Sequence, residues 1–102
     1  MITYLEKGKT LDDILTNEDT LVVFSATWCG PCQLLAETLE EYSKSNNTKI
    51  VKIDIDEHKE EAKKYGIMVV PTIMLYKNKE MIKQATGYLD QDELSDFIKT
   101  TV

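Results

Sequence analysis

The stretch that decides the fold is TLVVFSATWCGPCQLLAETLEE, residues 20–41. Residues 21–24 are apolar on both faces, which is typical of a strand in the middle of a sheet. From the second cysteine to about Ser45, apolar residues recur at helical spacing. Cys29 and Cys32, the two cysteines of the chain, lie between these runs, separated by a glycine and a proline. The stretch therefore predicts a strand-to-helix turn that carries both cysteines.

The rest of the chain alternates strand-like and helix-like segments. We expect strands at residues 2–6, 21–24, 50–55, 72–76 and 81–86, and helices starting at Thr10, at the cysteine pair, at Glu57 and at Asp90. The last helix has one apolar face, formed by Leu94, Phe97, Ile98 and Val102. This order predicts one α/β domain over residues 1–102, with a central, mostly parallel mixed sheet covered by helices on both faces. Antiparallel pairing is expected in the final hairpin, at one edge.

Composition excludes several classes of protein. The 102 residues fit a single domain. A net charge of −6, with acidic and lysine residues interspersed, argues against a nucleic-acid partner. No apolar run approaches the length of a membrane-spanning helix, and the first residues do not resemble a signal peptide. We therefore expect a cytoplasmic protein, in a compartment where thiols are kept reduced.

The cysteine spacing has several possible meanings. A structural zinc site needs four nitrogen or sulfur ligands, and the chain adds one histidine, His58, which we expect to be exposed on a polar helix and without a role. Haem attachment needs histidine after the second cysteine, where this chain has Gln33. A permanent disulfide is disfavoured by the reducing compartment and by the very short loop that it would close. No metal site is therefore predicted.

A redox-active dithiol explains the pair best. Cys29 lies at a helix start, where free N–H groups and the helix dipole favour an anion, and the thiolate is the nucleophilic form of cysteine. Cys32 lies one turn inside and is expected to be less accessible. Cys29 would attack a disulfide, and Cys32 would resolve the mixed disulfide. Pro31 suits the first helical turn.

Trp28-Cys29-Gly30-Pro31-Cys32, after a buried strand and before a helix, resembles the active site of the thioredoxin family. The resemblance extends over nearly the whole chain: KIVKIDIDEH is similar to the family's third strand, YGIMVVPTIMLYKNKE to the segment with a proline opposite the active site, and TGYLDQDELSDFI to the last strand and helix. It implies the thioredoxin fold.

The resemblance also implies roles for single residues. Trp28, Gly30, Pro31 and Pro71 would support the active site, with Pro71 in a cis peptide bond and facing the cysteines. Ile55, Val69, Val70, Thr86 and Gly87 would bind substrate, and the backbone of residues 69–71 could pair with an extended substrate segment. Simple core packing remains the alternative for Trp28, Ile55 and Val70.

One departure from the family pattern concerns the second strand. Thioredoxins usually have a buried aspartate where this chain has Val23, and that aspartate is thought to move the proton of the resolving cysteine. Lys52, the usual neighbour of that aspartate, is retained and could pair with Asp54. We expect Val23 to raise stability, because burying an unpaired charge is costly, and to slow turnover.

The expected function is that of a cytosolic protein-disulfide reductase. The resemblance implies disulfide-containing protein substrates and regeneration by an NADPH-dependent flavoenzyme, thioredoxin reductase. No bound cofactor is needed, because the two sulfurs carry the chemistry, and a monomer is expected. Two alternatives stay open: a specialised enzyme with a dedicated partner or another electron donor, and a binding subunit whose thiols matter little.

Overall fold

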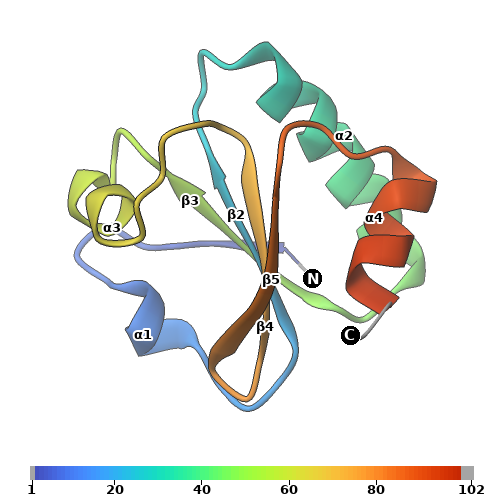
Figure 1. Ribbon diagram of the computed structural model, residues 1–102, viewed down its shortest axis with the longest axis horizontal. Coiled ribbons are helices and arrows are strands. Elements are labelled where there is room, and N and C mark those ends of the chain that lie inside the picture. Colours follow the sequence, from blue (N-terminus) through green and yellow to red (C-terminus); the bar gives the residue numbers. More distant parts are fainter. Residues whose placement is uncertain (1, 100–102) are drawn as a thin grey trace.

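The computed structural model describes residues 2–99, which form a five-stranded sheet flanked by helices (Figure 1). In chain order the elements are β1 (Ile2–Tyr4), α1 (Leu11–Ile14), β2 (Thr20–Ser25), α2 (Gly30–Ser45), β3 (Lys49–Asp54), α3 (Lys59–Lys64), β4 (Thr72–Lys77), β5 (Glu80–Thr86) and α4 (Gln91–Lys99). This is the predicted order, with boundaries that differ by a few residues at most. Val102, assigned to the apolar face of the last helix, lies outside the described residues.

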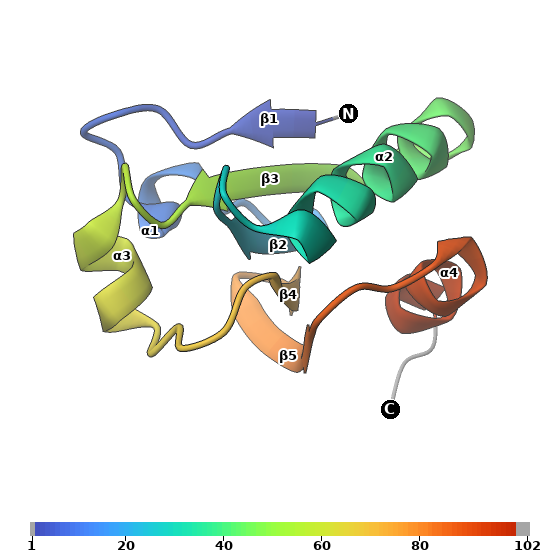
Figure 2. The same ribbon diagram turned by 90° about the horizontal axis from the view of Figure 1, so that it is seen from above.

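The strands lie side by side in the order β1-β3-β2-β4-β5, which Figure 2 shows from above. β3 pairs in parallel with β1 and β2, whereas β4 runs antiparallel to both β2 and β5. The α/β class and the mixed sheet are confirmed. The antiparallel final hairpin is present as expected, and the pairing of β2 with β4, for which no direction was predicted, is antiparallel as well.

The connections between the strands set their directions. A six-residue strand is about 20 Å long, and α2, with 16 residues, spans about 24 Å, so that it returns the chain to the far end of the sheet and β3 runs parallel to β2. The connection that contains α3 does not recross the sheet, and β4 runs antiparallel to β2. Helix length alone does not decide this, because the connection from β1 to β2 contains the shorter helix α1 and both strands run parallel to β3.

Two hydrophobic clusters pack against the two faces of the sheet. α1 and α3 cover one face and α2 and α4 the other, as Figures 1 and 2 both show. On the first face, Leu11 of α1 and Phe24 of β2 are fully buried. On the second, Leu35 of α2 and Leu94 of α4 pack against strand residues that include Val23. Alternate residues of β2 thus enter opposite clusters, which is why its sequence is apolar throughout.

The predicted helix starts follow capping rules. Thr10 caps α1 in a reciprocal arrangement with Asp13, whose backbone N–H donates to Thr10 Oγ1. Before α4, the backbone N–H of Glu93 donates to Asp90 Oδ1 at 2.9 Å, and the N–H of Asp90 donates back to Glu93 Oε1 at 3.0 Å. These pairs satisfy N–H groups that the helix itself leaves free. Both starts are therefore fixed by local sequence.

Candidate active site

The first turn of α2 holds the sulfur of Cys29. Cys29 is the N-cap residue, and the backbone N–H of Cys32 donates to its Sγ at 3.2 Å. Gly30 and Pro31 form the exposed start of the helix, where the N–H that proline lacks has no partner to lose. Because helix N-termini favour negative charge, this geometry stabilises the thiolate form of Cys29 in the reduced protein.

Cys29 and Cys32 are joined in a disulfide, with their Cα atoms 5.2 Å apart. Both are buried, each with 6% of its surface exposed, and they form a small cluster with Ala26. The predicted difference in accessibility is therefore not seen, because the two bonded sulfurs share one environment. The surroundings do differ: the sulfur of Cys29 receives the N–H at the helix start, whereas Cys32 lines a cavity beside the sheet.

The segment before β4 lies against the cysteines as the resemblance implied. The Val70–Pro71 peptide bond is cis, and the carbonyl oxygen of Val70 lies 3.5 Å from Cys29 Sγ. The backbone N–H of Gly87 donates to the carbonyl of Pro71 at 2.8 Å. Gly87 has a φ of +87°, a conformation that other residues rarely adopt. These contacts hold the end of β5, the proline and the cysteine pair together.

The predicted collar residues divide into a buried and an exposed group. Ile55 and Val70 are partly buried and pack directly against the cysteine cluster. Trp28 and Val69 are exposed, at 67% and 54%, so that core packing is excluded as the role of Trp28. Thr86 is exposed too, and it pairs with the first residue of β4 in the sheet ladder.

Three further residues belong to this region and were not predicted. Asp56 Oδ2 accepts a hydrogen bond from Trp28 Nε1 at 2.8 Å, which fixes the indole ring. Met68, between α3 and the proline, is 93% exposed, and Leu34, on α2, is 55% exposed. Two features of the sequence could have indicated these residues. Met68 is an apolar side chain in a loop, and Leu34 lies off the apolar face of its helix.

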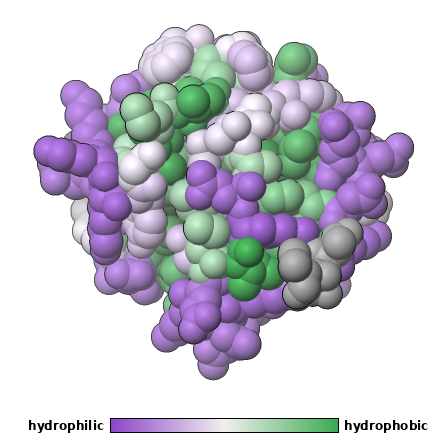
Figure 3. Space-filling view, in the orientation of Figure 1, coloured by the Kyte–Doolittle hydropathy of each residue, from purple (hydrophilic) through white to green (hydrophobic). Residues whose placement is uncertain are grey.

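The space-filling view shows how hydrophobic the surface is at the end of the molecule that carries the cysteine pair. In Figure 3, hydrophobic and weakly polar side chains cover the upper edge, where Figure 1 places the start of α2 and the loop before β4. Strongly hydrophilic side chains lie mainly at the sides and bottom. The cysteine pair is thus surrounded by a surface that suits contact with another protein.

Two expectations near the site are wrong. His58 is 7% exposed, and its Nε2 lies 2.9 Å from the carbonyl oxygen of Leu5, so that it ties the β1–α1 connection to the start of α3. Lys52 makes no ion pair with Asp54, and Asp54 Oδ1 accepts instead from two backbone N–H groups of the turn that follows β3. The Lys52 ammonium lies instead 5.1 Å from the centre of the Tyr4 ring.

Residues 2–99 contain no group of three or more histidine, cysteine, aspartate or glutamate side chains placed to hold a metal ion. Over the same residues, no helix has both the length and the apolar character that crossing a membrane requires.

Comparison with known sequences gives a consistent result. The model of the thioredoxin family matches residues 3–100. Thioredoxin of Bacillus subtilis (strain 168) is 40% identical over 80 residues, which cover 76% of this chain and 77% of that protein. Mitochondrial thioredoxin of Bos taurus is 35% identical over 102 residues, which cover 96% of this chain. The chain spans 61% of the length of that mitochondrial protein.

Solved structures agree with the sequences. A point mutant of thioredoxin from Halobacterium salinarum NRC-1 superposes with a TM-score of 0.86 at 35% identity, covering 96% of this chain and 88% of that one. Reduced thioredoxin pre-protein of Schistosoma mansoni gives 0.87 at 34% identity, covering 96% and 95%. On the strength of the matching sequence, fold and cysteine turn, the chain belongs to the thioredoxin family.

Proposed function

We propose that the protein reduces disulfide bonds in other proteins, with Cys29 as the nucleophile and Cys32 as the resolving cysteine. The observation that carries this proposal is the hydrogen bond from the Cys32 N–H to Cys29 Sγ at the start of α2. It gives Cys29 the positive electrostatic environment that makes a cysteine a thiolate near neutral pH. The active form is the reduced dithiol.

The reaction balances over the two sulfurs alone. The Cys29 thiolate attacks one sulfur of the substrate disulfide, the substrate S–S bond breaks, and its leaving thiolate takes a proton from solvent. Cys32 then loses its proton and attacks Cys29 Sγ. The bond between Cys29 and the substrate breaks, the second substrate thiol is released, and the protein disulfide forms. Two electrons pass to the substrate, so that no bound cofactor is required.

The substrate is proposed to lie across Val69, Val70 and the exposed ring of Trp28, with Ile55, Thr86 and Gly87 bordering the cysteines. In support, the N–H groups of Val69 and Val70 donate to no backbone carbonyl of the described residues. They are free to pair with an extended segment of a substrate, as in other strand-addition complexes. Such docking leaves the protein a monomer between turnovers.

A reductant must regenerate the dithiol, and we propose an NADPH-dependent flavoenzyme of the thioredoxin reductase type, in a reducing compartment such as the cytosol. The test is NADPH consumption with a thioredoxin reductase, this protein and insulin, beside Cys29→Ser and Cys32→Ser variants. Consumption that disappears in both variants supports the proposal.

Two other outcomes of the same assay point elsewhere. If dithiothreitol supports insulin reduction and the reductase does not, the dithiol serves a different donor. The replacement of the family's usual buried aspartate by Val23 favours such specialisation, because Val23 cannot take a proton. If neither reductant supports reduction, the proposed activity is wrong and the fold serves binding.

A further inference from the structure

Met68 is the most exposed large hydrophobic side chain of residues 2–99, with 93% of its surface in water. It lies between α3 and β4 and directly precedes Val69 and Val70, whose backbone is proposed to pair with substrate. A side chain so exposed gains nothing from burial in the folded protein. Because Val69 and Trp28 are exposed as well, Met68 extends an apolar surface of the kind that contacts other proteins.

The four methionines of the chain differ widely in exposure. Met74 is 2% exposed, and its sulfur lies 3.9 Å from the Tyr76 hydroxyl inside the hydrophobic core. Met81, on β5, is 45% exposed, and Met1 lies outside the described residues. The susceptibility of a sulfur to oxidants follows its exposure. Among the described methionines, Met68 is therefore the one that a dissolved peroxide reaches most easily.

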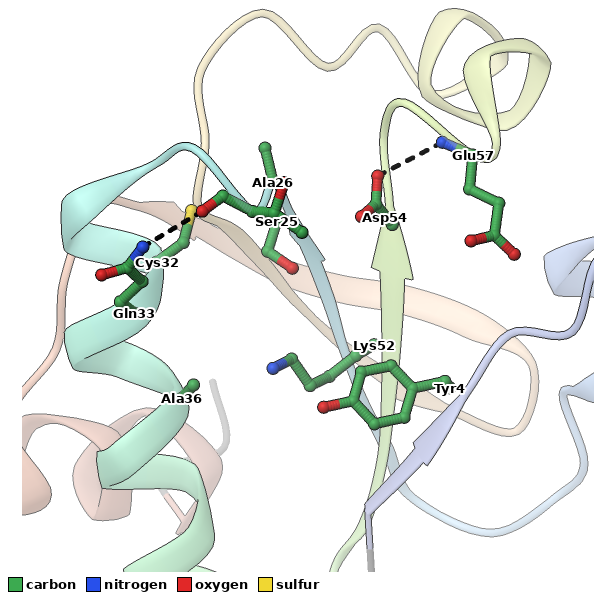
Figure 4. A pocket seen from close by; sticks show the side chains of 10 residues that line it. Tyr4, Ser25, Ala26, Cys32, Gln33, Ala36, Lys52, Asp54 and Glu57 are labelled. Atoms are coloured by element: carbon green, nitrogen blue, oxygen red, sulfur yellow. Dashed lines mark hydrogen bonds between the residues drawn. The ribbon is translucent and has the colours of Figure 1, made fainter.

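The cysteine pair is protected from the same oxidant while it is a disulfide. Peroxide reacts with the thiolate form of cysteine, which the bonded sulfurs of Cys29 and Cys32 lack. Figure 4 shows the cavity beside Cys32, and the described residues that line it include none from the segment 65–71. A chemical change confined to Met68 thus leaves this side of the cysteine pair as it is.

The oxidation of the thioether balances with a peroxide as the co-reactant. The Met68 sulfur attacks one peroxide oxygen, so that the S–O bond forms and the O–O bond breaks. The leaving hydroxide takes the remaining proton and becomes water, and two electrons pass from the sulfur to the peroxide. The sulfoxide is polar and chiral, whereas the thioether is apolar and flexible. An apolar substrate segment therefore loses a matching contact.

We propose that Met68 is a peroxide-sensitive modification site: its conversion to the sulfoxide weakens the docking of protein substrates and leaves the chemistry of the cysteine pair intact. The inference rests on the proposed function, because Met68 acts through a substrate that lies across Val69 and Val70. Methionine sulfoxide reductases, which reverse this oxidation in other proteins, would restore docking.

The first test uses mass spectrometry and needs no activity. The disulfide form is treated with hydrogen peroxide and digested, and the gain of one oxygen is followed at each methionine. Met68 should be oxidised at least about twofold faster than Met81 and at least about tenfold faster than Met74, in the order of their exposure. Met68→Leu should lack the fastest site. Equal rates at Met68 and Met74 would overturn the proposal.

The second test measures docking in a single turnover. After the peroxide is removed, the protein is reduced with dithiothreitol, desalted and mixed with insulin. The second-order rate constant should be about fivefold lower than without peroxide, which corresponds to about 1 kcal/mol and to the loss of a partly buried methionine contact. Bis(2-hydroxyethyl) disulfide, too small to span from the cysteines to Met68, should react at an unchanged rate. Met68→Gln, which is polar and of similar length, should show the lower insulin rate without peroxide.

Two variants separate Met68 from other oxidised groups. Whatever its rate before treatment, Met68→Leu should lose nothing after peroxide, and Met81→Leu should lose as much as the original protein. Treatment with methionine sulfoxide reductases should restore the original rate. An unchanged insulin rate once Met68 is oxidised, or an equal loss with the small disulfide, would overturn the proposal. A protein that fails to reduce insulin before any peroxide treatment refutes the proposed function, whereas the mass measurement still shows whether Met68 is the sensitive site.

Discussion

Replacing Val23 with aspartate tests how strongly the core excludes a charge beside Lys52. Val23 is 1% exposed and belongs to the cluster between the sheet, α2 and α4. Losing the burial of a valine side chain costs about 1.5 kcal/mol. Keeping the new carboxyl group protonated at pH 7, against an ordinary pKa of about 3.9, costs up to about 4 kcal/mol more. Attraction to Lys52 offsets part of this, since a nearby cation favours the charged form.

We therefore expect the free energy of unfolding of Val23→Asp to fall by about 3–5 kcal/mol at pH 7 and by only about 2 kcal/mol at pH 4. The sign follows from the raised pKa of a buried acid. Between pH 4 and that raised pKa the folded state binds more protons than the unfolded state, so that stability falls as pH rises. Adding Lys52→Met should enlarge the loss at pH 7, because the compensating cation is removed.

The assay is urea unfolding of the reduced protein at several pH values between 4 and 8. Val23→Asn is the matched control, since it has nearly the same shape and no ionisable group. The difference in the free energy of unfolding between Val23→Asn and the original protein should be the same at every pH. If Val23→Asp and Val23→Asn give parallel curves, or if Val23→Asp costs less than about 1 kcal/mol at pH 7, the argument that this position rejects a charge is refuted.

Three further predictions concern the surroundings of the site and the core. Asp56→Ala should lower the rate of insulin reduction a few-fold, because it frees the Trp28 indole, and should cost less than about 1 kcal/mol of stability. His58→Ala should cost about 2–3 kcal/mol in urea unfolding, because it leaves the Leu5 carbonyl without its buried partner. Burial, with Tyr65 and Asp12 nearby, raises the pKa of Tyr76 to about 12. Below about pH 10 the Tyr76 hydroxyl is protonated in both the folded and the unfolded protein. As pH rises from about 10 toward 12, it ionises in the unfolded protein first, so that the free energy of unfolding should fall, and this fall should be less steep in Tyr76→Phe.

Each of these predictions has a result that would contradict it. Lys59→Ala, next to His58 but exposed, should change stability by less than about 0.5 kcal/mol; equal losses in both variants would show that the buried hydrogen bond is unimportant. Unchanged activity in Asp56→Ala would mean that the indole needs no anchor. Identical alkaline unfolding profiles for the original protein and Tyr76→Phe would rule out the raised pKa.

The elements themselves follow closely from local sequence. The apolar run of β2, the cysteine turn and the helix starts at Thr10 and Asp90 each depend on residues near one another in the chain, and each is found where it was predicted. The direction of β4 was not predicted, because the alternation of strands and helices does not encode whether a connection recrosses the sheet before the next strand begins.

In the site, too, the features that depend on neighbouring residues were predicted, and the contacts between distant residues were not. The cysteine turn and Pro71 were found because they form a contiguous pattern or match a family segment. His58 was misjudged because its partner, the Leu5 carbonyl, lies 53 positions away and is a backbone atom that no sequence pattern marks. The free ammonium of Lys52 was missed for a similar reason, since the turn after β3 takes up the Asp54 carboxylate that was expected to pair with it.

The central claim is that Cys29 attacks and Cys32 resolves. The most direct measurement is the intact mass of reduced Cys32→Ser and Cys29→Ser proteins after brief exposure to a disulfide-containing peptide. We predict that Cys32→Ser accumulates an adduct of one peptide thiol on Cys29, removed by dithiothreitol, while Cys29→Ser reacts far more slowly. Faster adduct formation on Cys32 in Cys29→Ser, or no adduct in either variant, would contradict the account.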